Sequence, residues 1–134
     1  MNLKLADIWI AAGILMGFQI ASFSWRVMRE ATVGDKQQPT WLPPADWVNL
    51  VSMLTLVIGV FIMPIVHSVD LNLVKHVFGL ALILFAGYPF ALAGHYDMYN
   101  HKTARGFEYF TLQEKLAIVV IVAVVIVYVV LWVR

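Results

Sequence analysis

The most apolar stretch of the chain is its last one, Leu116 to Val133, which reads LAIVVIVAVVIVYVVLWV. These 18 residues carry no charge, and a membrane-spanning helix needs roughly 17–25 mainly apolar residues. The many β-branched side chains would favour a strand in water. In a bilayer, however, a lone strand leaves its backbone hydrogen bonds unmade, whereas a helix satisfies them within the segment. The stretch therefore predicts a transmembrane helix.

Three further runs without Asp, Glu, Lys or Arg precede this one. They contain 18, 23 and 20 residues, and they span Ile8–Trp25, Trp47–Val69 and Val77–Tyr96. Each is long enough to cross a bilayer as a helix. The sequence thus predicts an all-α integral membrane protein in which four transmembrane helices form a small bundle. We expect one membrane domain over residues 1–134, with spans at about 8–25, 47–69, 77–96 and 116–133.

The composition of the chain supports this class of protein. Of its 134 residues, 62% are hydrophobic and only 13% are charged, against roughly 45–50% and about 25% in soluble domains. A disordered chain would have the opposite balance. The absence of cysteine excludes disulfides, thiolate catalysis and cysteine-bound metal. The nine Lys and Arg residues are scattered, so we expect no nucleic-acid partner.

The basic residues predict an orientation. Loops 26–46 and 97–115 carry six of them, namely Arg26, Arg29, Lys36, Lys102, Arg105 and Lys115. The side with both termini carries three, namely Lys4, Lys75 and Arg134. Loops rich in Lys and Arg stay in the cytoplasm. We therefore expect an integral protein of a bacterial inner membrane, with these two loops cytoplasmic and both termini outside.

Several local signals mark helix ends. Thr111 and Glu114 have the T-x-x-E spacing of a capping box, which would open the last helix. Asp70 can cap the third helix. Pro43 and Pro44 precede the second helix, where proline is tolerated.

Small residues predict how the helices pack. Gly13, Gly17 and Ala21 form a stripe at i, i+4 and i+8 of the first helix, and Gly87 and Ala91 form a shorter one on the third. Such stripes let two membrane helices approach closely. We expect the stripe to join helices within one bundle; the alternative is an interface between subunits.

Two prolines lie inside spans and predict kinks. Pro64 and Pro89 each lack a backbone donor, which frees the carbonyl of Val60 and of Phe85 respectively. Kinked helices can form gates or pockets, but proline kinks are also common in membrane proteins without either.

No Asp, Glu, Lys or Arg lies near the middle of a span. Proton relays and ion-coupled transporters use such residues, so this absence argues against a proton-coupled antiporter. The chain also lacks the common nucleotide-binding, zinc-protease and hydrolase motifs. We therefore expect no catalytic residues and regard an enzyme as the less favoured interpretation.

The histidines are the candidate ligands for a cofactor. His67 and His76 flank the short connection between the second and third spans, while His95, Asp97 and His101 cluster after the third. Imidazole groups bind haem iron or a divalent metal, and a carboxylate can add a further ligand to a divalent metal. The simpler interpretation is that these groups are solvated at the membrane interface.

Together these features predict a small polytopic membrane protein without catalytic activity. It would act as a subunit, an assembly factor or a homo-oligomeric component of a membrane complex, with lipids and other membrane subunits, or itself, as partners. The alternatives are a haem- or metal-binding membrane redox protein that uses interfacial histidines, and a small transporter or lipid-handling protein.

Overall fold

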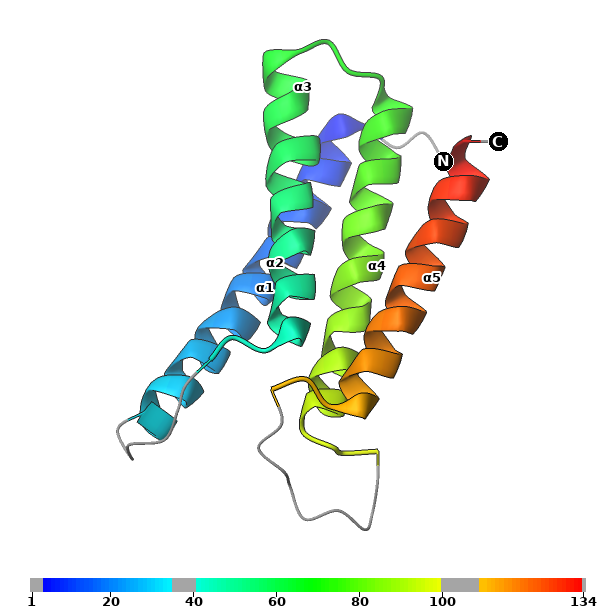
Figure 1. The fold of residues 1–134 in the computed structure, drawn as a ribbon. Helices are drawn as coiled ribbons and strands as arrows, with labels where there is room; N and C mark the ends of the chain where they lie inside the picture. The colour runs from blue at the N-terminus through cyan, green and yellow to red at the C-terminus, as the bar shows by residue number, and fades with distance from the viewer. Residues whose placement is uncertain (1–3, 35–40, 100–108, 134) are drawn as a thin grey trace.

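The computed structural model describes residues 4–34, 41–99 and 109–133 and shows four long helical segments (Figure 1). The first is α1 (Leu5–Gly34). The second comprises α2 (Pro44–Thr55), η1 (Leu56–Ile62) and α3 (Met63–Val66). The others are α4 (Leu71–His95) and α5 (Leu112–Val133). α1 begins and α5 ends at the same end of the bundle as the connection between α3 and α4. We call the opposite end the loop end.

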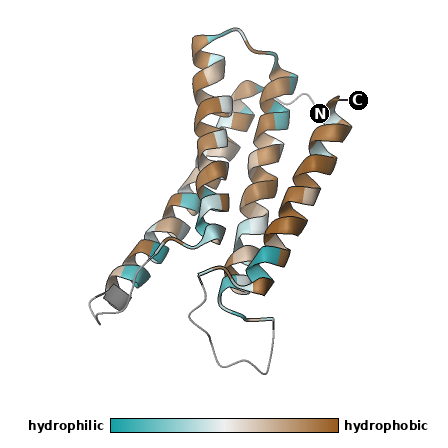
Figure 2. Ribbon diagram, viewed as in Figure 1, coloured by the Kyte–Doolittle hydropathy of each residue, from teal (hydrophilic) through white to brown (hydrophobic). Residues whose placement is uncertain are grey.

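The four segments confirm the predicted all-α membrane architecture. Each is long and apolar enough to cross a membrane, and the described residues contain no strand. The run of valine and isoleucine in α5 is helical throughout, as the need for internal backbone hydrogen bonds in lipid requires. Hydrophobic residues cover most of the length of all four segments in Figure 2.

The helices differ in length from the uncharged runs. α1 continues past Trp25 to Gly34, and α4 begins at Leu71, six positions before the predicted start. The second segment ends at Val66, because His67 has an extended backbone. The runs mark only the stretch without charges, whereas helical hydrogen bonding continues into the polar interface.

The side-chain caps expected at Asp70 and Thr111 are present, and proline stands at the start of the second segment. The Asp70 side chain accepts a hydrogen bond from the backbone N–H of Asn72 at 3.3 Å. The Thr111 hydroxyl accepts one from the N–H of Glu114 at 3.2 Å. α2 begins at Pro44. Asp70 and Thr111 each accept from a backbone N–H that the helix start would otherwise leave unpaired, and Pro44 has no N–H to pair.

The core consists of two apolar clusters, and α4 contributes to both. The larger cluster joins α1, the second segment and α4; its buried members are Ile8, Ala12, Leu15, Leu56, Val60, Val74 and Ala81. The smaller one joins α2, α4 and α5 through Ala45, Ala91 and Ile121. α5 packs mainly on α4, and most of its apolar side chains are exposed on the bundle surface. α4 is therefore the helix on which the others assemble.

The backbone around Pro64 is irregular. The seven residues before α3, Leu56–Ile62, are π-helical. The carbonyl of Val60, which Pro64 leaves without its usual donor, accepts a hydrogen bond from the Trp9 indole N–H at 2.8 Å. The neighbouring helix α1 thus supplies the missing partner, as membrane helices with proline require. Pro89 lies inside α4, which runs unbroken from Leu71 to His95.

Small residues of α4 lie against α5. A Cβ on Gly87 would come within 2.5 Å of the Ile121 side chain, and one on Gly94 within 2.8 Å of the Gln113 backbone. Ala91, between them, is fully buried. Gly87 and Ala91, the predicted packing stripe of this helix, therefore lie where α4 and α5 meet.

We expect Gly94→Ala to destabilise the bundle by about 1–3 kcal/mol, the usual cost of overpacking. The added methyl group would meet rigid backbone atoms of α5, so the two helices must separate. The free energy of unfolding in detergent, followed by circular dichroism, measures the effect. Gly13→Ala is the control, because no atom lies within 4 Å of a Cβ there. Equal stability of the two variants would contradict the prediction.

Candidate functional site

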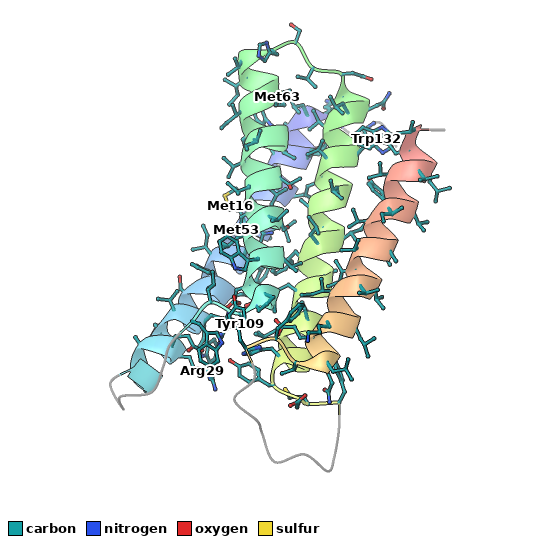
Figure 3. All side chains as sticks on the ribbon, viewed as in Figure 1. Met16, Arg29, Met53, Met63, Tyr109 and Trp132 are labelled. Atoms are coloured by element: carbon teal, nitrogen blue, oxygen red, sulfur yellow. The ribbon has the colours of Figure 1, made fainter. Side chains whose placement is uncertain are left out.

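Hydrophilic residues gather at the loop end of the bundle (Figure 2). Arg29 and Tyr109 lie near this end in Figure 3, whereas Trp132 lies at the other. Several of these side chains are buried despite their charge or polarity; they are Gln19, Arg26, Asp46, Asn49, Ser52, His95, Thr111 and Glu114. They form three connected groups, each of which joins at least three helical segments.

The first group is built on the carboxylate of Asp46, which is completely buried. Its Oδ2 accepts from Arg26 Nε at 3.1 Å, and its Oδ1 accepts from the Tyr88 hydroxyl at 2.9 Å. These residues come from α1, α2 and α4. A buried ion pair is stable only when its remaining hydrogen-bonding atoms also find partners. Tyr88 supplies that partner for the carboxylate.

A second arginine extends this group toward the end of α1. Arg29 Nη1 and Arg26 Nη1 both contact Glu30 Oε1, at 3.2 and 2.9 Å. Both guanidinium groups also donate to the Tyr96 hydroxyl, Arg29 at 2.6 Å. The Arg29 guanidinium lies 4.6 Å from the centre of the Tyr96 ring, a cation–π contact. α1 is thereby held to the C-terminal end of α4.

The second group is built on Glu114, whose side chain is also completely buried. Its Oε1 accepts from the backbone N–H of Ala45 at 2.7 Å, and its Oε2 lies 3.0 Å from His95 Nδ1. When Glu114 is ionised, its carboxylate can only accept, and the His95 Nδ1–H is then the donor of this contact. The predicted capping box is therefore only half present. Thr111 caps the helix, but Glu114 reaches α2 and α4 instead of turning back to Thr111.

The third group lies deeper in the bundle. Gln19 Nε2 donates to the Ser52 hydroxyl at 2.5 Å, and Ser52 donates to the backbone carbonyl of Ala81 at 2.6 Å. Asn49 Nδ2 donates to the carbonyl of Gln19 at 3.2 Å. This chain of bonds joins α1, α2 and α4. Such interhelical bonds help to specify packing where the surrounding lipid is as apolar as the side chains.

The two buried carboxylates are fully engaged within the protein. Asp46 and Glu114 each have both oxygens within hydrogen-bonding distance of a donor. A general base or nucleophile must instead reach a substrate. In this geometry Arg26 neutralises the Asp46 charge, Ala45 and His95 engage the Glu114 oxygens, and these contacts join the loop ends of all four segments.

The predicted cofactor ligands lie in different surroundings. His67 is exposed after α3, whereas the His76 ring stacks on Trp132 with centroids 4.8 Å apart. His95 contacts Glu114. Asp97 follows α4 with a left-handed φ of 52°, and His101 lies outside the described residues. Within residues 4–34, 41–99 and 109–133, no three His, Asp or Glu side chains are grouped as a metal site. The haem or metal hypothesis stays a prediction.

The stripe of α1 faces away from the bundle. Gly13, Gly17 and Ala21 are all exposed. No heavy atom lies within 4 Å of a Cβ built on either glycine. The expected role in joining helices of one bundle therefore does not apply to Gly13 and Gly17, whose close-approach surface is open in the described structure.

Sequence reasoning missed the acidic residues of the site. In the sequence Asp46 stood out only as a charge at one end of a span, and Glu114 only as half of a capping box. The available signal was their position, because both lie at the start of a span on the same predicted side of the membrane. Spacing alone does not show which way either side chain points.

Comparison of the chain with models of known protein families, with curated proteins and with solved structures finds no match. The function must therefore be argued from the arrangement of the chain's own residues.

We expect Asp46→Ala to lower the free energy of unfolding by about 3–5 kcal/mol, because it leaves the Arg26 charge buried without its partner. Chemical unfolding in detergent measures the loss. Asp7→Ala, which removes an exposed carboxylate from α1, should change stability far less. Combining Asp46→Ala with Arg26→Met should recover part of the loss. No recovery would show that the charge is not the cause.

We expect Glu114→Ala to cost about 1–3 kcal/mol for each buried donor that it leaves unpaired, the Ala45 N–H and the His95 ring. Glu114→Gln keeps an acceptor for the N–H and a group that can pair with the imidazole, so it should retain most of the stability. Thermal unfolding of the two purified variants measures the difference. Similar losses in both would point to the charge rather than to the hydrogen bonds.

Proposed function

We propose that this protein is a non-enzymatic subunit of a membrane complex that joins its partner through the outer face of α1. The observation that carries the proposal is the open stripe of Gly13 and Gly17, which has no heavy atom within 4 Å of either Cβ position. The partner is a transmembrane helix of a second copy or of another subunit, because only a helix follows this stripe across the bilayer.

Energetics supports a packing role for the two glycines. A glycine inside a helix is less favourable than alanine by roughly 0.5–1 kcal/mol, and a Cβ at either position would meet no other part of the described chain. Two membrane helices that cross at such a stripe gain close backbone contact. The spacing of four residues between Gly13, Gly17 and Ala21 places all three on one face of α1, where a single partner helix can contact them.

The buried network favours a structural over a catalytic role. Arg26 neutralises Asp46 inside the bundle, Ala45 and His95 engage the Glu114 oxygens, and both carboxyl groups are fully shielded from the surroundings. Such an arrangement stiffens the loop end and holds α1 against α2 and α4. The stripe is thereby presented on a helix anchored at both ends, by Trp9 and by Arg26.

The proposal includes an orientation in the membrane. Among the described residues, Arg26, Arg29 and Lys115 lie at the loop end, and Lys4 and Lys75 at the other. The excess of positive charge supports a cytoplasmic loop end.

The double variant Gly13→Leu, Gly17→Leu tests the interface. We expect the tagged wild type, extracted from its native membrane in mild detergent, to form a particle larger than the 15.1 kDa chain, and the variant to fall to the monomer mass. Bulky side chains at these positions would hold the partner helix away. Light scattering or native mass spectrometry measures the mass.

Two controls separate association from folding. Val119→Phe, Val122→Phe adds as many carbon atoms at each position on the exposed side of α5 and should preserve the complex. Co-purification of two differently tagged copies identifies self-association, whereas a different chain in fixed ratio identifies another subunit. A wild type that is strictly monomeric and brings nothing from native membranes would refute the proposal.

A further inference from the structure

A cavity of about 380 Å³ lies between α1 and α4 at the loop end. Its apolar wall consists of Trp25 from α1 and of Phe85, Pro89 and Leu92 from α4. Trp25 is 77% exposed and Pro89 is also exposed, so the cavity opens sideways from the bundle. Because both helices span the membrane, that opening faces lipid near the interface.

The polar residues that line the cavity are Ser22, Arg26, Arg29, Tyr88 and Tyr96. Asp46 is completely buried behind Arg26 and has both oxygens engaged. Glu30 takes one nitrogen of each arginine. The side of this cluster that lines the cavity therefore presents guanidinium and phenol groups rather than the Asp46 carboxylate.

One buried donor of this cluster has no hydrogen-bond partner among the described residues. The Arg26 side chain is only 6% exposed, with its Nε bonded to Asp46 and its Nη1 to Glu30 and Tyr96. Its Nη2 is buried and has no hydrogen-bond partner in the described structure. A buried charged donor without an acceptor is unfavourable. An oxygen supplied from the cavity would remove that cost.

We propose that this cavity binds a membrane amphiphile with a phosphate headgroup. A headgroup oxygen would accept from Arg26 Nη2 and another from Arg29, whose side chain is 37% exposed. The acyl chain would lie against Phe85, Pro89 and Leu92. Guanidinium groups suit phosphate oxygens in charge and geometry, and the apolar wall next to them suits a hydrocarbon chain. The inference is independent of the proposed interface on α1.

Isothermal titration of the purified protein in dodecyl maltoside with dodecyl phosphate tests the site. We expect saturable binding with one molecule per chain. Arg26→Lys keeps the charge opposite Asp46 but removes Nη2, and it should weaken binding by about tenfold, as the loss of one charge-assisted hydrogen bond predicts. Arg29→Gln should weaken it similarly. Leu92→Trp, which fills the apolar wall, should reduce binding as well.

A control variant and two comparison ligands show which part of the amphiphile the cavity recognises. Lys115→Gln removes an exposed positive charge at the same end of the bundle and should leave the affinity unchanged. Inorganic phosphate should bind far more weakly than dodecyl phosphate; equal binding would assign the site to a free anion and overturn the proposal. Equal affinity of dodecanol would overturn the role of the headgroup.

The outcome does not depend on the variant at the buried arginine. Should Arg26→Lys lower the unfolding midpoint, Arg29→Gln, at a partly exposed position, still decides the question. Unchanged affinity in both Arg29→Gln and Leu92→Trp would refute the site.

Discussion

The burial of the Asp46 carboxylate is the constraint on which the loop end of the bundle depends. A charge in a low-dielectric interior is stable only beside an opposite charge and with its oxygens hydrogen-bonded. Arg26 and Tyr88 meet both conditions, and this requirement holds α1, α2 and α4 in one register. The buried Glu114 oxygens have partners in Ala45 and His95, and these contacts join α5 to α2 and α4.

Backbone hydrogen bonding constrains the opposite end of the bundle in a similar way. Pro64 removes a donor from the second segment, and the Trp9 indole supplies another to Val60. A carbonyl without a partner would be costly in lipid, so α1 is held here by a polar contact as well as by the apolar cluster around Ile8 and Leu56. Between these two anchors the outer face of α1, with its two glycines, is free to meet another helix.

Much of the fold was predictable, and less of the site. Uncharged runs such as Leu116–Val133 predict membrane helices because lipid permits no other way to satisfy a lone segment's backbone. The caps at Asp70 and Thr111 were predictable because they are local. The pairing of His95 with Glu114 was not predictable. These residues are 19 positions apart and lie on two helices, and sequence spacing does not specify how the two helices are rotated relative to each other.

The sequence by itself determined the number of helices and their approximate ends, because those properties depend on local hydropathy and on the placement of charge. Only the tertiary structure decided which face of each helix turns inward. It placed Gly87 and Ala91 against α5 but left Gly13 and Gly17 outside, although both stripes have the same spacing. The rotation of a helix about its axis depends on which of its faces makes the most favourable contacts with the other helices. On α1 that face carries the buried Gln19 and Arg26, so the glycines turn toward the membrane.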